Sequence, residues 1–369
     1  MSRFIQIHML TAYPPANLNR DDLGRPKTAR MGGVDRLRVS SQSLKRAWRT
    51  SDMFQQAMAG HIGTRTKEMG KKIYKAFIET GVKHKNALEW SKAIAGHFGK
   101  LKTLSRKDKE QLSTIPEQER LEQGLVELEI EQLAHFCPAE QKNIWQLVEK
   151  ASGEGKAPDK QDLELLRSKT KAVDIALFGR MLASAPAYNI EAACQVAHAI
   201  SVHQVAVEDD YFTAVDDLNE GRDDLGAAHI GETGFAAGLF YAYICLNREL
   251  LIDNLNGDVP LAQRAVRALT EAAVKVPPNG KQNSFASRAY ASYVLAEKGD
   301  QQPRSLSAAF LKPVTDRDGE DFALAAIEAL DRQQKNMDLV YGACADQRCD
   351  INVPAGKGTL QKLLDFIAE

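Results

Sequence analysis

Residues 36–49, RLRVSSQSLKRAWR, join a strand pattern directly to a helix pattern. Residues 36–39 alternate charged and apolar side chains, which is typical of a half-buried strand. Ser40 and Ser41 then offer hydroxyl groups that can cap a helix, which is predicted to run from Gln42 to about Met58. The stretch therefore predicts a strand that leads into a capped amphipathic helix.

The predicted helix has one polar and one apolar face. Four long polar side chains fall within an arc of about 100°: Gln42, Lys45, Arg46 and Arg49. Leu44, Ala47 and Trp48 lie on the opposite side, where we expect the core. Free backbone amides at a helix start and adjacent cationic side chains suit a phosphate group. A basic helix that merely faces solvent is the alternative interpretation.

The motif indicates a nucleic-acid backbone rather than a nucleotide triphosphate as the phosphate ligand. The G-x-x-x-x-G-K-[ST] spacing of nucleotide-triphosphate loops is absent, which favours the phosphates of a nucleic-acid backbone. The segment at 17–33 supports this interpretation, because it reads as a basic loop that leads into the strand.

Charge is distributed unevenly along a chain whose formal net charge is −1. Residues 1–50 contain ten Lys or Arg and three Asp or Glu, a local net charge of +7. Residues 205–235 contain nine Asp or Glu and one Arg, a local net charge of −8. This asymmetry indicates a face that binds a polyanion, or opposite faces that associate between copies. Two separate solvated patches would also account for it.

The hydrophobic pattern predicts strands near both ends of the chain and helices between them. Strands are expected at 3–10, 192–205 and 238–250, and a further strand follows a loop within 277–297. A clear amphipathic helix is expected at 259–276. This order predicts an α+β fold rather than a doubly wound sheet.

Residues 51–170 are predicted to be predominantly helical, with apolar residues at helical spacing over 84–98, 118–136 and 138–151. Pro138 suits the first turn of the last of these helices. Residues 152–160, SGEGKAPDK, are expected to form a flexible polar linker.

The remaining composition argues for a reduced, membrane-free setting. Five scattered cysteines are typical of reduced thiols in a cytoplasm, and no second Cys or His pair beside Cys344 and Cys349 suggests a metal site. No apolar run is long enough to cross a bilayer, and the N-terminal stretch does not have the pattern of a signal peptide.

Two adjacent aromatic residues, Tyr211 and Phe212, stand within the acidic segment. Neighbouring residues of a strand point to opposite faces, so one ring can pack inward while the other projects. A projecting aromatic ring can stack on a nucleobase, whereas two packed core aromatics are the alternative.

Six stretches together resemble the backbone subunit of the type I-E CRISPR surveillance complex called Cascade. These stretches cover the first fifty residues and the region 172–250, with a weaker similarity at 274–285. They are NLNRDD (17–22), GGVDRLRVSSQSLKRAWR (32–49), VDIALFGRM (173–181), AHAISVHQV (197–205), DYFTAVDDL (210–218) and GAAHIGETGFAAGLFYAY (226–243).

The resemblance implies a protein that is not an enzyme, needs no cofactor or metal, and has a hand-like α+β fold. A palm resembling an RNA-recognition motif (RRM, ferredoxin-like) would comprise residues 1–50 and 172–369. A β-hairpin thumb would span about 200–232, and residues 51–171 would form an inserted helical finger subdomain. Several copies would stack along one CRISPR RNA, together with other Cascade subunits, and present its bases for pairing with target DNA in antiviral defence.

The resemblance also implies two groups of RNA-binding residues. One group matches positions that hold the RNA backbone: Arg20, Lys27, Ser40, Gln42, Lys45 and Arg49. The other matches positions around the thumb that interrupt base stacking: Met181, Tyr211, Phe212 and Thr213. Tyr211 stands where a tryptophan is expected.

Two other classes of function remain open from the sequence. A metal-dependent ribonuclease could use paired aspartates to bind a metal ion, although no pair has diagnostic spacing. Related backbone subunits of other CRISPR types cut target RNA with an aspartate. The candidates are Asp21-Asp22, Asp209-Asp210, Asp216-Asp217 and Asp223-Asp224, with His198, His203 and His229 as acid or base. A self-assembling structural protein would instead use its basic face to bind acidic neighbours.

Overall fold

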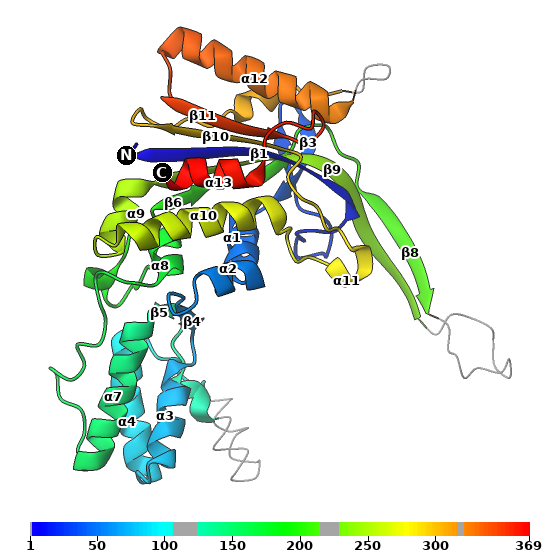
Figure 1. The fold of residues 1–369 in the computed structure, drawn as a ribbon. Coiled ribbons are helices and arrows are strands. Elements are labelled where there is room, and N and C mark those ends of the chain that lie inside the picture. The colour runs from blue at the N-terminus through cyan, green and yellow to red at the C-terminus, as the bar shows by residue number, and fades with distance from the viewer. Residues whose placement is uncertain (1, 106–123, 215–228, 316–320) are drawn as a thin grey trace, which may run out of the picture. The chain divides into compact units, whose positions relative to one another are not determined.

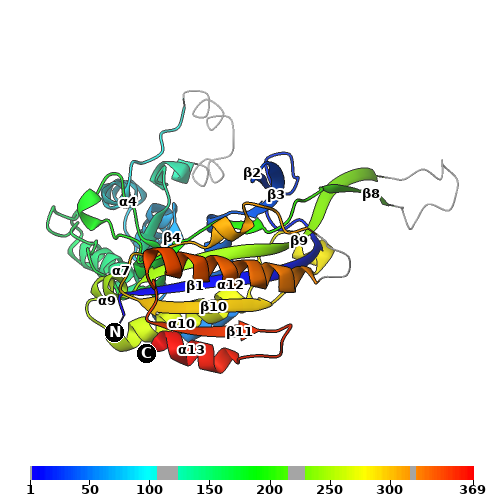
Figure 2. The ribbon, with the colours of Figure 1, turned by 90° about the horizontal axis from the view of Figure 1, so that it is seen from above.

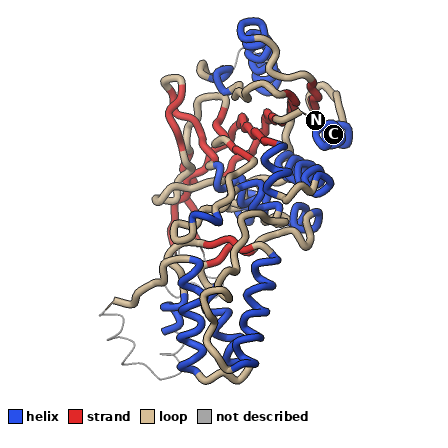
Figure 3. The backbone as a smooth tube through the Cα atoms, turned by 90° about the vertical axis from the view of Figure 1, so that its left-hand side faces the viewer, coloured by secondary structure: helices blue, strands red, loops and turns tan. Residues whose placement is uncertain are grey.

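The computed structural model describes residues 2–105, 124–214, 229–315 and 321–369. The chain divides into two compact units, which we call the sheet unit and the helical unit. The sheet unit comprises Met1–Ala57, Cys194–Arg248 and Gln263–Glu369, and the helical unit comprises Met58–Ala193 and Glu249–Ala262. In Figure 3 the strands coloured red lie mainly in the sheet unit, whereas long helices dominate the helical unit.

An antiparallel sheet organises the sheet unit, in the order β11-β10-β1-β9-β7-β3-β2, with β6 and β8 also paired to β9. The strands are β1 (Phe4–Ala16), β2 (Thr28–Met31), β3 (Val34–Val39), β6 (Cys194–Val196), β7 (Ala199–Ser201), β8 (Glu208–Ala214), β9 (His229–Asn247), β10 (Tyr293–Gly299) and β11 (Gln347–Asn352). This mixed α+β architecture agrees with the predicted class.

Helices cover both faces of the sheet (Figures 1 and 2). On one face lies α12 (Phe322–Tyr341), whose Leu330 packs with Leu10 and Leu295 in a common core. On the other face lie α13 (Leu360–Ala368), α1 (Ser41–Arg49) and the part of α10 (Val259–Lys275) from Gln263 onward. Two covered faces explain why six consecutive residues of β1, from Ile5 to Leu10, are all buried. The short elements are α2 (Asp52–Ala57), α11 (Gln282–Phe285) and the 3₁₀ helix η3 (Ser307–Phe310).

The predicted helix from Gln42 to about Met58 is two helices, α1 and α2. The side-chain hydroxyl of Thr50 donates to the Arg46 carbonyl at 2.8 Å, and that of Ser51 donates to the Trp48 carbonyl at 2.8 Å. The Ser51 hydroxyl also accepts from the Phe54 backbone N–H, which begins α2. Local hydroxyl bonds of this kind compete with the helical ladder, so the chain turns at this point.

The single strand expected at 192–205 is also divided. β6 ends with Val196 opposite Ile244, and β7 places Ile200 opposite Tyr241. Between these two pairs, the segment that joins β6 to β7 has one residue more than the facing part of β9. This irregularity is a bulge at residues 197–198. The strand expected at 238–250 begins earlier, because β9 starts at His229. It also ends earlier, at Asn247, because residues 248–250 are helical.

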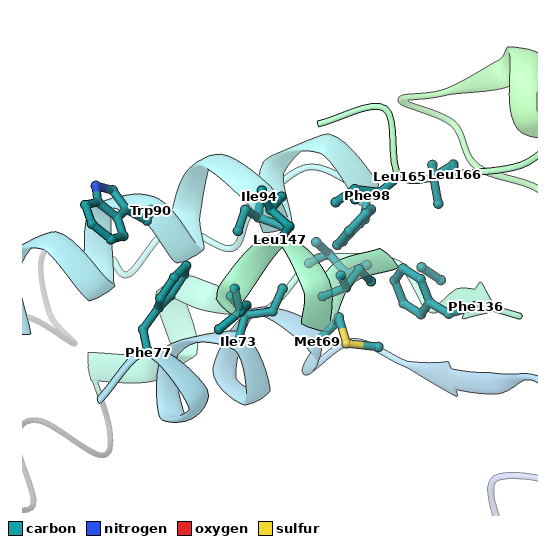
Figure 4. Packing of buried hydrophobic residues seen from close by; sticks show 14 of the residues in the cluster. Met69, Ile73, Phe77, Trp90, Ile94, Phe98, Phe136, Leu147, Leu165 and Leu166 are labelled. Atoms are coloured by element: carbon teal, nitrogen blue, oxygen red, sulfur yellow. The ribbon is translucent and has the colours of Figure 1, made fainter. Parts of the chain in front are cut away.

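The helical unit has its own apolar core (Figure 4). Phe77, Trp90 and Phe98 are buried there, and Phe136 packs edge-on against Phe98 with ring centroids 4.9 Å apart. Its described elements are β4 (Thr64–Thr66), α3 (Met69–Glu79), α4 (His84–Phe98), η1 (Leu125–Leu128), β5 (Ala134–Phe136), α7 (Pro138–Glu154), α8 (Val173–Phe178), η2 (Pro186–Tyr188) and α9 (Arg248–Asn254, from Glu249 onward).

The helix predicted at 118–136 is wrong from Leu125 onward. Residues 118–123 lie outside the described residues and Gly124 is helical, but the chain then forms η1 and β5. Ile130 pairs with Leu101, and β5 pairs with β4, so contacts distant in sequence override the helical spacing. The prediction for Pro138 is confirmed, because it is the first residue of α7. That helix continues into the predicted linker and ends at Glu154, where Gly155 caps it with a φ of 62°.

Candidate nucleic-acid interface

The polar face predicted for residues 42–49 is exposed on α1. Leu44, Ala47 and Trp48 are buried beneath it, with exposed fractions of 5%, 3% and 1%. Gln42 and Arg46 are exposed, and Lys45 and Arg49 are partly exposed. The division between an apolar and a polar face is therefore confirmed.

The start of α1 has fewer available amides than the sequence suggested. The hydroxyl oxygen of Ser40 caps the helix by accepting from the backbone N–H of Ser43 at 3.3 Å. The N–H of Ser41 donates to Nδ1 of His198 at 3.4 Å. The expectation of a wholly free helix start is thus wrong, because the protein itself supplies acceptors for these two amides.

His198 lies at this helix start in a cationic environment. Burial, followed by the charges of Arg38 and Lys27, lowers the pKa of its imidazole below the ordinary 6.5. A neutral ring is consistent with Nδ1 accepting from the amide of Ser41. The contact gives His198 a structural role at the start of α1.

The segment at 17–27, which we call the basic loop, is fixed against α1 by Asn19. The side-chain oxygen of Asn19 accepts from the backbone N–H of Ser40, and its carbonyl accepts from the N–H of Lys27, both at 2.8 Å. Arg20 and Pro26 form a bridge that closes the loop. These bonds join the loop that carries exposed Arg20 and partly exposed Lys27 to the start of α1 within the sheet unit.

The same loop is also fixed to the paired strands β8 and β9. The amide nitrogen of Asn17 donates to the carbonyls of Gly24, at 2.9 Å, and Gly234, at 2.8 Å. Arg25 forms an ion pair with Asp209 at 2.7 Å. Sequence reasoning missed both asparagines, although two Asn residues in a basic loop are a signal for side-chain bonds to the backbone.

The strands β8 and β9 form an antiparallel hairpin that extends beyond the main sheet (Figure 1). Tyr211 is 65% exposed and Phe212 is 43% exposed, so neither ring is a packed core aromatic. Phe212 lies opposite Gly231, where an added Cβ would be 2.3 Å from the ring. A glycine is therefore required for the ring to lie across the facing strand. Thr213 follows on β8 and is exposed.

Met181 belongs to the helical unit, whereas the other predicted site residues belong to the sheet unit. Its side chain is 80% exposed and borders a cleft of about 170 Å³. The preceding residue, Arg180, is buried and forms an ion pair with Glu140 at 2.8 Å. Met181 therefore projects from a rigidly held segment.

In each of the two described aspartate pairs, one member has a structural partner. Oδ1 of Asp21 accepts from the backbone amides of Leu23, at 3.0 Å, and Arg25, at 2.9 Å. Asp209 is paired with Arg25. Among the described residues, no three His, Cys, Asp or Glu side chains gather in a way that could hold a metal ion. The pairs at 216–217 and 223–224 lie outside the described residues.

The described helices include none with the length and apolarity needed to span a membrane.

Taken together, the fold and surface define an α+β protein with a basic loop, a polar helix face and a hairpin with exposed aromatics. The chain belongs to the CT1975-like protein family, whose sequence model matches residues 5–363. It is similar to a chain in a structure of a CRISPR RNA-guided surveillance complex in a pre-nicking state. The two are 28% identical, the match covers 99% of each chain, and the TM-score is 0.81.

A chain from another structure of a CRISPR RNA-guided surveillance complex has a similar fold. Its TM-score is 0.71 at 23% identity, and the match covers 99% of each chain. A comparison with curated protein sequences finds no match.

Proposed function

We propose that this protein is the backbone subunit of a type I-E Cascade complex and binds CRISPR RNA without regard to sequence and without catalysis. The observation that carries the proposal is the position of the polar face of α1 beside the basic loop. Support comes from the match, along 99% of both chains, with a component of a CRISPR RNA-guided surveillance complex.

The grip on RNA would be made to phosphates. Lys45 and Arg49 on α1 and Arg20 and Lys27 on the basic loop supply positive charge, while Ser40 and Gln42 supply neutral hydrogen-bonding groups. Contacts to phosphate carry no sequence information and leave the base edges free to pair with target DNA. Four such cations per copy would each add about −0.7 to the slope of log affinity against log salt concentration.

The hairpin would act on the bases. Tyr211, Phe212 and Thr213 would enter the RNA strand and interrupt its stacking at intervals, with Met181 contributing from the helical unit. Aromatic faces stack on any base, so this action would also be independent of sequence. Short pre-ordered RNA segments would lower the entropic cost of pairing with a target strand.

In this proposal the sheet unit includes the RRM-like palm, the hairpin is the thumb and the helical region at 51–171 is the finger. Several copies would stack along one RNA with the other Cascade subunits in the cytoplasm. The acidic residues of the thumb, such as Asp210, could help to dock it on the basic face of the next copy.

The experiment is co-expression of the protein with its neighbouring subunits and a CRISPR RNA, followed by purification. We expect an elution peak that contains RNA of defined length and an absorbance ratio at 260 and 280 nm far above that of bare protein. A self-assembled protein peak free of RNA would contradict the proposal and favour a purely structural role.

A further inference from the structure

A cleft of about 370 Å³ lies on one side of α1 in the sheet unit. It is bounded by the basic loop, α1 and the segment that precedes α11. Its lining residues are Leu18, Asn19, Arg20, Asp21, Ser43, Arg46, Ala47, Asn279 and Gly280. We call it the Arg46 cleft.

The far wall of the Arg46 cleft is held close to the basic loop. A Cβ added to Gly280 would lie 2.1 Å from the carbonyl oxygen of Leu18, so the two backbones touch and only glycine fits. This contact fixes exposed Asn279 at the edge of the cleft. The wall therefore depends on a segment more than 200 residues away from α1 in the sequence.

The electrostatics of the Arg46 cleft favour an anion. Arg20 and Arg46 are both exposed, and neither guanidinium group has an acceptor among the residues that the structure describes. The carboxylate in the lining, Asp21, already accepts hydrogen bonds from two backbone amides of its own loop through Oδ1. Ser43 and Asn279 add neutral hydrogen-bonding groups.

A second cleft that Arg20 lines has a different balance of charge. Arg20 also lines a larger cleft of about 540 Å³ at the base of the hairpin. That cleft contains Asp22, Asp209 and Glu232 as well as its cations, and Arg25 is already paired with Asp209. Its mixed charge does not favour a phosphate, whereas the charge of the Arg46 cleft does.

We propose that the Arg46 cleft is a phosphate-binding site, in which Arg20 and Arg46 together hold one phosphate of the RNA backbone. The inference rests on the proposed function and adds Arg46 and Asn279 to its RNA-binding residues. Guanidinium groups suit this role because their planar donors bind phosphate oxygens in pairs. Asn279 would donate a further hydrogen bond from the opposite wall.

Lys45 and Arg46 lie at different positions around α1. Lys45 is the residue before Arg46, so it lies about 100° away around the helix axis. The two side chains would therefore contact different phosphates of the RNA backbone.

The test is a titration of the purified protein with a fluorescein-labelled single-stranded RNA of mixed sequence at several salt concentrations. We expect Arg46→Ala to weaken binding several-fold and to reduce the salt slope by about 0.7, the amount for one phosphate. Arg46→Lys should keep the slope but bind less tightly, because paired hydrogen bonds are lost. Arg332→Ala is the matched control, since it removes an exposed arginine from α12 on the other face of the sheet.

Double-mutant cycles test which residues share a phosphate. The effects of Arg20→Ala and Arg46→Ala on the logarithm of RNA affinity should not add when the two changes are combined, because both residues would hold the same phosphate. The effects of Lys45→Ala and Arg46→Ala should add, because these residues would hold different phosphates. One outcome would overturn the Arg46 site and leave the proposed function standing. In that outcome Arg46→Ala has the same RNA affinity as Arg332→Ala, while the double variant with Lys45→Ala and Arg49→Ala binds RNA more weakly. If none of these changes affects binding, the proposed function itself has failed.

Discussion

Asn19 joins the basic loop to α1, because its side-chain oxygen accepts a hydrogen bond of 2.8 Å from the backbone N–H of Ser40. Ser40 in turn caps α1 through its hydroxyl group. One partly buried contact therefore sets the position of Arg20 and Lys27 relative to the polar face of the helix. The consequences of this contact can be measured.

We predict that Asn19→Ala lowers the free energy of unfolding by about 1–3 kcal/mol, because it leaves the amide of nine-tenths-buried Ser40 without its acceptor. RNA affinity should fall more than it does for Arg20→Ala, since the loop that carries both Arg20 and Lys27 loses its anchor to α1. Urea unfolding and RNA titration measure the two effects. An unchanged unfolding free energy would show that Asn19 does not fix the loop.

The hairpin prediction concerns Phe212 and the glycine beneath it. Phe212→Ala should leave the salt slope of RNA binding unchanged and alter base spacing, seen as a loss of periodic reactivity when bound RNA is chemically probed. Gly231→Ala should have the same effect, because the new Cβ would lie 2.3 Å from the present position of the ring. A periodic reactivity pattern identical to that of the unmodified protein would contradict the proposed interruption of base stacking by Phe212. Tyr211→Phe is the conservative control.

The core beneath α1 gives a stability prediction. Trp48 is 1% exposed and lies under the polar face, so Trp48→Ala should create a cavity and cost about 3–5 kcal/mol. Urea unfolding of the variant measures the loss. A cost below 1 kcal/mol would mean that α1 is not held on the sheet by its apolar face.

A pH dependence follows from His8 on β1. Its imidazole is fully buried, 2.8 Å from the hydroxyl of Tyr241, and burial lowers its pKa below 6.5 despite the nearby Glu297. Between the folded and unfolded pKa values the unfolded chain binds more protons, so stability is lost as pH falls below about 6.5. The test is to measure unfolding free energies between about pH 7.5 and pH 5, a range that brackets the ordinary pKa of histidine. An NMR titration of the imidazole would follow its protonation directly. A His8 ring protonated at pH 7 would reverse the sign.

The sequence predicted local features better than distant ones. The two faces of α1, the start of α7 at Pro138 and the strand at β1 depend on spacing within a few residues, and the structure has each of them. The double anchoring of the basic loop depends instead on Asn17 reaching Gly234, across 217 positions. Periodicity carries no information about such pairs.

The failure at 118–136 has the same cause. Apolar residues there recur at helical spacing, yet β5 pairs with β4 as an antiparallel strand and its three residues are buried. The free helix start was likewise mispredicted, because His198 supplies its acceptor from 157 positions away. In both places a non-local partner decided the local structure.

Absence of catalysis is tested by incubating the assembled complex with target RNA and Mg²⁺. We expect intact RNA, because Asp21 is already bound to the amides of Leu23 and Arg25. Cleavage that disappears in Asp22→Ala would instead identify a metal-dependent ribonuclease.

The most direct measurement is the amount of CRISPR RNA retained by the co-expressed complex when Lys45 and Arg49 are both changed to alanine. Arg332→Ala serves as the control for loss of surface charge. We predict a folded double variant that loses most of its RNA and has a salt slope smaller by about 1.4, the amount for two phosphates. Full retention of RNA with an unchanged slope would contradict it.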